Sequence, residues 1–252
     1  MVHSHRADTA YAGLFCACIA LSIVPTRTAL AVAVGGAATV TSDYIYRGFS
    51  ESNGQAALQL DLHATTNAGT FIGAWGSTRY HDLAPGADYG VDLYLGQRFA
   101  LSSEWNTSIT AVDHTYVGGS QRHSNDYQEL SAAVSYLDRW TLSVSAIPNA
   151  VRYSGYVRTG RYPAYVTDTS GQWLIANGIF VTGGVGYYFF TGSSVHPQIA
   201  DTGYAYGNVG LAYEWRSWRL DVGYFLTQTK ARRLFPYPLA DNRVAGTLSW
   251  HF

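Results

Sequence analysis

The 252-residue chain has only two cysteines, Cys16 and Cys18, and few charged side chains, which make up 13% of its residues. An average soluble domain carries about 25% charged residues. After residue 31 the sequence also lacks any run of about 20 apolar residues, the length that a membrane-spanning helix needs. The rest of the chain therefore has no disulfide framework or thiolate metal site, and it resembles neither an ordinary soluble domain nor a helical membrane protein.

A basic surface is missing too. The formal net charge is −1, whereas binding to nucleic acid calls for a strongly basic face. The histidines are scattered without the spacing of metal ligands. We therefore expect no nucleic-acid partner, no metal site and no cofactor.

Residues 1–31 have the features of a cleaved secretory signal peptide. Residues 11–24 form an apolar run that is too short for a membrane-spanning helix, and Ala29-Leu30-Ala31 is a small-x-small cleavage site. Both cysteines would leave with this segment. We expect the mature protein to begin after it and to form one domain over residues 32–252.

The C-terminal segment from Asn242 to Phe252 alternates apolar with polar residues and ends on an aromatic side chain. A strand of this pattern has one face suited to lipid and one suited to a polar lumen, as in the final strand of an outer-membrane β-barrel. An amphipathic edge strand of a soluble protein is the alternative. In the first case, Trp250 and Phe252 would form the assembly signal that the barrel assembly machinery of a Gram-negative bacterium reads.

Eleven further segments show strand-like patterns of apolar and polar residues, less clearly in some than in others. They cover residues 37–47, 55–65, 70–80, 89–100, 104–116, 127–136, 140–147, 165–176, 179–190, 204–215 and 218–227. The expected fold is all-β, a single transmembrane antiparallel up-and-down β-barrel of about 12 strands with both termini in the periplasm. Because the segment 165–176 is the weakest, and residues 148–170 could contain a further hairpin, ten or fourteen strands are alternatives.

The connections between these segments alternate between short turns and longer loops, which is typical of bacterial barrels. Six of the seven tryptophans lie near a short turn or the C-terminus, where an aromatic girdle would meet the membrane interface. These are Trp105, Trp140, Trp173, Trp215, Trp218 and Trp250.

Two short blocks carry a family resemblance. Residues 42–50 read S-D-Y-I-Y-R-G-F-S, and residues 73–77 read G-A-W-G-S. They resemble the S-D-Y-x-x-R-G-x-S and G-x-W-x-S blocks of the TorF-type porin family of proteobacteria. The resemblance implies an outer-membrane channel and names no substrate.

Twelve strands about 4.8 Å apart and tilted by about 45° close a cylinder roughly 26 Å across, which leaves a narrow bore at most. The side chains expected to line it carry both signs of charge: Asp43, Arg47, Asp61, His63, Asp92, Arg98, Glu129, Glu214, Arg219, Asp221 and Arg243. Opposed charges could select small polar or ionic solutes, or they could fill the barrel with salt bridges. Within this set we expect Asp43 and Arg47 to pair with Arg243 and Asp61.

The function that fits this pattern is passive diffusion of small hydrophilic solutes or ions through a monomeric channel, and not catalysis. Inward tyrosines at positions 94, 204 and 206 could line a path for a sugar. A non-conducting barrel that acts through its outer loops is the alternative. A hydrolase is a distant third, with His114 beside Asp113, and His123 and Ser124 in the next loop, as its candidate groups.

Three cations, Lys230, Arg232 and Arg233, lie in the last long loop. Phosphate groups of lipopolysaccharide at the outer rim would attract them. An ordinary solvated loop is the alternative. The partners expected for the whole chain are therefore outer-membrane lipid, lipopolysaccharide, small solutes and, during biogenesis, the assembly machinery.

Overall fold

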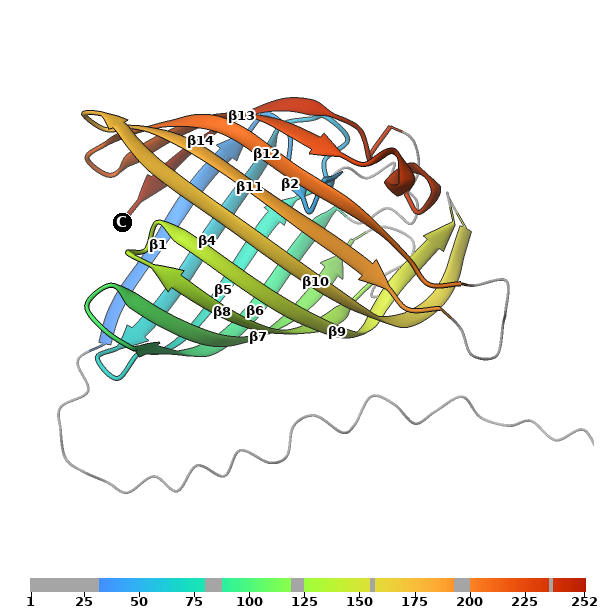
Figure 1. The fold of residues 1–252 in the computed structure, drawn as a ribbon, viewed down its shortest axis with the longest axis horizontal. Helices are drawn as coiled ribbons and strands as arrows, with labels where there is room; N and C mark the ends of the chain where they lie inside the picture. The colour runs from blue at the N-terminus through green and yellow to red at the C-terminus, as the bar shows by residue number, and fades with distance from the viewer. Residues whose placement is uncertain (1–31, 80–87, 119–124, 155–156, 193–199, 236–237) are drawn as a thin grey trace, which may run out of the picture. The chain divides into compact units, whose positions relative to one another are not determined.

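The computed structural model describes residues 32–79, 88–118, 125–154, 157–192, 200–235 and 238–252. Twelve of its strands form a closed antiparallel barrel, in which neighbours in the chain are neighbours in the sheet and β1 pairs with β14 (Figure 1). The barrel strands are β1 (Val32–Thr41), β4 (Ala57–Thr66), β5 (Thr70–Thr78), β6 (Tyr89–Ala100), β7 (Trp105–Val117), β8 (Tyr127–Tyr136), β9 (Trp140–Ser154), β10 (Val157–Ala176), β11 (Ile179–Phe190), β12 (Thr202–Trp215), β13 (Trp218–Thr227) and β14 (Arg243–His251). The predicted all-β barrel of about twelve strands is confirmed.

Side chains alternate between the two faces of each strand because successive residues of a strand point to opposite sides. On β4, Leu58, Leu60 and Leu62 are 62%, 49% and 47% exposed. Asp61 lies between the last two and accepts a hydrogen bond from Tyr94 of β6 inside the barrel. The outer face of β4 is therefore apolar, and its inner face is polar.

The two ends of the chain close the barrel. The Phe252 amide donates to the Gly36 carbonyl at 3.1 Å, and the Gly36 amide donates to the Phe252 carbonyl at 3.0 Å. A Cβ on Gly36 would lie 2.4 Å from the Asp61 carbonyl oxygen and 2.8 Å from the Phe252 ring. Closure at this seam therefore requires glycine, since any side chain would push the strands apart.

Strands β9 and β10 are longer than the predicted segments 140–147 and 165–176. They extend through much of the expected loop, as far as Ser154 and from Val157 onward. Pro148 and Pro163 interrupt the sequence pattern here, but the pairing shifts register between Tyr162 and Ala164 and so accommodates the second proline. The predicted ends of these two strands are wrong for this reason. Tyr80, the expected end of another strand, lies outside the described residues.

The first strand also differs from its prediction. It ends at Thr41 rather than Arg47, and the chain then turns into the barrel as the short pair β2 (Ile45–Tyr46) and β3 (Phe49–Ser50). Arg47 and Gly48 form the turn with φ values of 50° and 77°, in the left-handed region that tight hairpin turns use. We call residues 42–56 the inner hairpin. Asp43 and Arg47 therefore belong to this segment, not to the barrel wall as expected.

The only helix among the described residues is the single 3-10 turn η1 (Thr229–Arg233), between β13 and β14. No described helix is long and apolar enough to cross a membrane.

Candidate functional site

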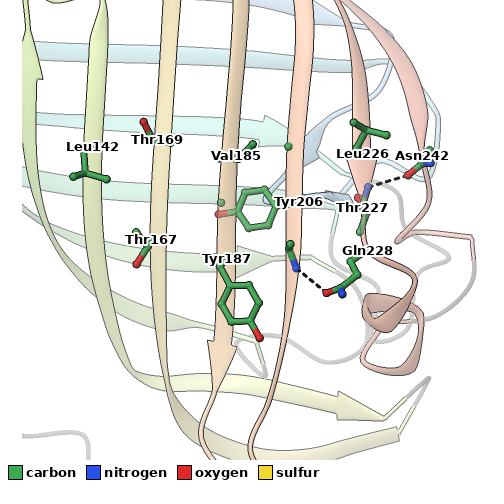
Figure 2. Close-up of a pocket in the computed structure, with 13 residues that line it drawn as sticks. Leu142, Thr167, Thr169, Val185, Tyr187, Tyr206, Leu226, Thr227, Gln228 and Asn242 are labelled. Carbon is green, nitrogen blue, oxygen red and sulfur yellow. Dashed lines mark hydrogen bonds between the residues drawn. The ribbon is translucent and has the colours of Figure 1, made fainter.

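A shallow groove of about 650 Å³ lies on the wall formed by β9 to β13, toward the ends that carry the long loops (Figure 2). Small residues, Ala205 and Gly207 of β12, form its floor, and its sides include Val185, Tyr187 and Leu226. These three side chains are 64%, 44% and 44% exposed, so the groove faces outward. An apolar depression of this kind can accept a flexible apolar chain.

The segment after β13 borders this groove and carries the three loop cations. Arg232 Nη2 donates to Asp241 Oδ1 at 2.6 Å, whereas Lys230 and Arg233 are exposed. The backbone amide of Asn242 and the guanidinium of Arg232 lower the pKa of the Asp241 carboxyl. Arg232 is therefore engaged within the loop, and Lys230 and Arg233 present their charges to the surroundings.

The six tryptophans near the short turns all point outward. Their exposed fractions run from 37% for Trp140 to 54% for Trp215. Trp140 contacts Trp173 with ring centroids 4.2 Å apart, and Trp250 contacts Phe252 at 4.9 Å. Trp105 and Trp218 begin β7 and β13, and Trp250 stands next to the last residue of β14, opposite Trp218, whereas Trp75 points into the barrel.

Inside the barrel, the inner hairpin reaches from one side of the lumen to the other. Arg47 bonds to Glu129 on β8, which lies five places from β1 around the barrel in one direction and seven in the other. The Tyr204 hydroxyl of β12 donates to the Arg47 carbonyl at 3.1 Å, and Thr227 Oγ1 of β13 donates to the Gly48 carbonyl at 2.6 Å. The turn of the hairpin is thus held from three separate strands.

The Arg47 guanidinium makes a two-pronged contact with Glu129. Nη1 donates to Oε2 at 2.8 Å and Nη2 donates to Oε1 at 2.7 Å, with side chains that are 10% and 5% exposed. The nearest oxygen of Asp168 on β10 lies 4.0 Å from Arg47 Nε. Parallel bonds of this type fix both position and orientation. The expected pairing of Arg47 with Asp61 is wrong, because the hairpin carries Arg47 away from the neighbouring strand.

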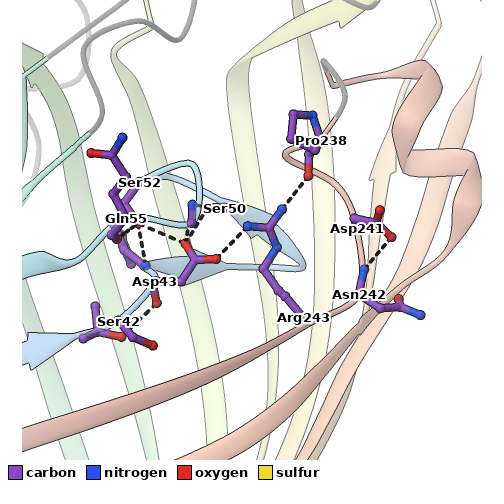
Figure 3. Close-up of polar contacts among 12 residues, drawn as sticks. Ser42, Asp43, Ser50, Ser52, Gln55, Pro238, Asp241, Asn242 and Arg243 are labelled. Carbon is purple, nitrogen blue, oxygen red and sulfur yellow. Dashed lines mark hydrogen bonds and ion pairs between the residues drawn. The ribbon is translucent and has the colours of Figure 1, made fainter.

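The base of the hairpin is held by Asp43 (Figure 3). Its Oδ1 accepts from Ser50 Oγ at 2.5 Å, from Ser52 Oγ at 2.9 Å and from the Gly54 amide at 3.2 Å. Its Oδ2 accepts from Arg243 Nη1 of β14 at 2.7 Å. The expected pairing of Asp43 with Arg243 is present, although Asp43 approaches from the hairpin.

The two sequence blocks that carry the family resemblance meet at this point. The ring of Tyr44, in the first block, lies 5.3 Å from that of Trp75, in the second. Close by, Arg79 pairs with Glu51 of the hairpin and stacks over the Tyr116 ring at 4.2 Å. The two blocks, which are separate in the sequence, thus belong to one packed cluster.

His114 lies in the same cluster. Its Nδ1 is 2.8 Å from Asp92 Oδ1, its ring stacks on Tyr127 at 4.2 Å, and its Nε2 is 3.8 Å from Glu129 Oε2. Asp113, its neighbour in sequence, bonds to Gln128 on the opposite face of the sheet. Asp113 therefore cannot orient His114 as a catalytic base. His123 and Ser124, the other groups of the hydrolase hypothesis, lie outside the described residues.

The packing around the hairpin is tight. A small, partly open cavity of about 10 Å³ is bordered by Tyr44, Trp75, Tyr116 and Tyr127, and it is large enough for about one water molecule. Tyr204 is buried against Phe235, with ring centroids 5.6 Å apart. At this level the inner hairpin and the side chains around it lie inside the barrel and narrow its lumen.

The remaining inward charges lie toward the short turns and are paired with one another. Asp61 contacts His63 Nδ1 at 2.7 Å and accepts from the Tyr94 hydroxyl at 2.6 Å. Arg219 donates to Asp221 at 2.8 and 2.9 Å, and it also pairs with Glu214. Arg98 pairs with Asp138 near the end of the barrel.

Sequence reasoning missed three charged residues that hold the hairpin in place, Glu51, Arg79 and Asp168. Glu51 was expected in a loop, Arg79 stands at a strand end, and Asp168 lies on the weakest predicted strand. The available signal for Asp168 was that Asp168 and Ser170 share one face of the strand, opposite Tyr165. The Tyr206 hydroxyl of β12 donates to Asp168, which shows that this position faces the lumen.

The described residues contain no group of three or more histidine, cysteine, aspartate or glutamate side chains that could hold a metal ion.

The architecture defines a porin-like β-barrel. The NanC porin matches 86% of this chain and 98% of its own, with a TM-score of 0.54 and 10% identity. The match to the KdgM porin covers 88% of this chain and 99% of that porin, with a TM-score of 0.47 and 10% identity. The match to Salmonella typhi OmpF covers 88% of this chain and 97% of OmpF, with a TM-score of 0.44 and 9% identity. At these identities the likeness extends to the fold alone.

The chain belongs to the Gcw_chp family, described as a bacterial protein of unknown function, which matches residues 27–234. This match does not confirm the TorF-type resemblance. No curated protein sequence matches the chain.

Proposed function

We propose that this protein is a monomeric outer-membrane channel for passive diffusion of small hydrophilic solutes or ions. The observation that carries the proposal is the contrast between the two faces of the barrel. The outer face is apolar and suits lipid, whereas the inner face carries carboxylates, guanidinium groups and tyrosine hydroxyls that suit water and ions. Residues 1–31 would act as the export signal and leave the mature barrel of residues 32–252.

The orientation follows from the connections. Short turns and both chain ends would face the periplasm, and the long loops would face outward. The six outward tryptophans at the short-turn ends would then form the girdle at the periplasmic interface, where aromatic rings are favoured.

The inner hairpin is the proposed constriction. It brings Asp43, Arg47 and Glu51 to the long-loop half of the lumen, opposite Arg243, Glu129 and Arg79 of the wall. Toward the short turns, the Asp61–His63 and Arg219–Asp221 groups line the wall. A solute would meet charges of both signs, which selects by charge arrangement rather than by net charge.

A non-conducting barrel is the second candidate, and one observation favours it. The hairpin packs against the segment between β13 and β14, with the Phe49 and Phe235 rings 4.5 Å apart. The Ser50 amide also donates to the Leu239 carbonyl at 3.0 Å. If these contacts were permanent, the lumen would stay closed to solutes and the outer loops would perform the function.

Planar-bilayer recording of the refolded residues 32–252 tests the proposal. Discrete current steps of fixed size are expected, with a reversal potential under a salt gradient that changes in Arg219→Gln. Silence from protein shown to be folded and inserted would overturn the channel and favour the non-conducting barrel. Arg139→Glu, a charge change at an exposed short-turn residue, serves as the matched control.

Lipopolysaccharide is the proposed lipid partner at the long-loop end. Lys230 and Arg233 would meet its phosphates, and an acyl chain would enter the groove of Ala205 and Gly207. Reversing Lys230, Arg232 and Arg233 to glutamate should leave assembly intact but lower the barrier of the outer membrane to bulky antibiotics. Unchanged antibiotic sensitivity would contradict the partnership, and Arg139→Glu is again the control.

A further inference from the structure

The Arg47 guanidinium contacts the barrel wall in the way that a bound ligand contacts its binding site. The guanidinium belongs to the inner hairpin, whereas its partners belong to three strands of the wall: Glu129 on β8, Asp168 on β10 and Tyr188 on β11. Glu129 binds it through both oxygens, and the Tyr188 ring centroid lies 5.8 Å from the guanidinium carbon. Two carboxylates and an aromatic ring are the groups that recognise an organic cation.

The two carboxylates of the wall also accept hydrogen bonds from other wall residues. Ser131 Oγ donates to Glu129 Oε1 at 3.0 Å, and the Tyr206 hydroxyl donates to Asp168. These bonds come from the wall and not from the hairpin. The two carboxylates would therefore keep their places if Arg47 moved away.

Departure of Arg47 would leave an uncompensated charge in a dry site. The Glu129 side chain is only 5% exposed, and removing one partner of a buried ion pair is strongly unfavourable. The charge must then be compensated, either by a proton or by another cation that enters from the lumen. A planar fork of N–H donors satisfies both oxygens of Glu129, whereas a spherical ion or a single ammonium satisfies fewer.

We propose that Glu129, Asp168 and Tyr188 form a binding site for organic cations of the guanidinium or amidinium class, which the chain's own Arg47 occupies at rest. A solute of this class competes with Arg47 for Glu129 and breaks the ion pair that ties the turn of the inner hairpin to β8. The inference rests on the proposed channel function and adds to it a solute class and an internal competitor.

The other hairpin contacts limit what the solute displaces. Asp43 and Glu51 pair with Arg243 and Arg79, so the base of the hairpin has anchors that a cation does not compete for. The moving part is the Arg47 side chain, because the carbonyls of Arg47 and Gly48 stay bonded to Tyr204 and Thr227. Its release opens the side of the lumen next to β8 and β10 while the base stays attached.

Binding of guanidinium ion to the full mature barrel in detergent tests the site without any need for conduction. Calorimetric titration is performed at constant ionic strength, with potassium ion as the control cation. Arg47→Ala should bind guanidinium at least about tenfold more tightly than the wild type, because its internal competitor is gone. Arg47→Ala combined with Glu129→Gln should lose this binding. Equal binding by the single and double variants, or no binding by folded Arg47→Ala, would overturn the proposal.

If Arg47→Ala fails to fold, Arg47→Lys replaces it, since lysine keeps the charge but not the fork. Bilayer currents provide the second readout. Millimolar guanidinium should raise the open fraction of the wild-type channel, and equimolar potassium should not. Binding without any current would preserve the site and contradict the channel, whereas current without binding would preserve the channel and contradict the site.

Discussion

Asp43 and Arg243 lie 200 positions apart in the sequence and are joined by a hydrogen bond of 2.7 Å between Oδ2 and Nη1. The bond ties the base of the inner hairpin to the last strand of the barrel. The Asp43 side chain is 5% exposed and that of Arg243 is 16% exposed. One contact therefore links the closure of the barrel to the position of the inner hairpin.

Removal of one partner should be costly. Arg243→Ala leaves Asp43 buried without its cation, and we expect a loss of about 3–5 kcal/mol in the free energy of unfolding. Urea unfolding in lipid vesicles measures it. Arg98→Ala, which removes an exposed ion pair, is the control, with an expected loss of about 0–1 kcal/mol. Equal losses would mean that the Asp43 contact contributes no more than a surface pair.

Alanine substitutions at two glycines of the hairpin distinguish the effect of a steric clash from the effect of backbone strain. Gly48 and Gly54 both have positive φ, at 77° and 73°. A Cβ on Gly48 would lie 2.7 Å from Tyr206 Cβ and Thr227 Oγ1, whereas the nearest atom to one on Gly54 is 3.6 Å away. Gly48→Ala should therefore unseat the turn and enlarge the channel current, and Gly54→Ala should lower stability by about 1 kcal/mol with the current unchanged. Identical currents in the two variants would contradict the constriction.

Depth in the membrane should set the cost of an outward charge. Val209 lies in the middle of β12 and is 54% exposed, whereas Trp215, also 54% exposed, is the last residue of that strand. Val209→Arg should lose about 2–4 kcal/mol of stability in vesicles and Trp215→Arg about 0–1 kcal/mol beyond the loss of the ring itself. Folding free energies from urea titration compare them. A midstrand arginine tolerated without loss would exclude a lipid-facing wall.

The terminal aromatic ring should matter for assembly more than for stability. The backbone of Phe252 pairs with Gly36, so Phe252→Ala keeps both bonds while removing a ring that is 49% exposed. We expect slower insertion in cells, measured by pulse-chase, and unchanged spontaneous folding into pure lipid vesicles. Phe99→Ala removes a comparably exposed ring on β6 and is the control. Equal assembly rates would refute the signal.

The loop between β13 and β14 should hold its ion pair in acid. The pKa of Asp241 is lowered by the Asn242 amide and by Arg232, below the ordinary value of about 3.9. Its contribution to loop order is therefore present above that ordinary value and is lost as the pH falls through the lowered one. Carbon-13 NMR titration should show a higher pKa in Arg232→Gln. An unshifted value would show that Arg232 does not act on Asp241.

The alternation of apolar and polar residues was enough to predict the barrel. Leu58, Leu60 and Leu62 alternate with polar residues, and the pleat of a strand converts that pattern directly into an outer and an inner face. The alternation of short and long connections likewise predicted an up-and-down order, in which strands that follow one another in the chain are neighbours in the barrel. Prolines hid the true lengths of β9 and β10, because a register shift that tolerates proline leaves no periodic signal.

Tertiary structure alone decided what fills the lumen. Period-2 alternation records which face a residue occupies, and it carries no information about contacts across the barrel. Arg47 and Glu129 are 82 positions apart, and β1, from which the hairpin continues, and β8 lie on opposite sides of the barrel. Their meeting depends on the inner hairpin, which leaves the wall after Thr41, where the pattern suggested a continuing strand, and reverses at the left-handed turn of Arg47 and Gly48. The sequence thus determined the wall, because wall contacts are local and repeat, and the fold determined the constriction, because its contacts are distant and unique.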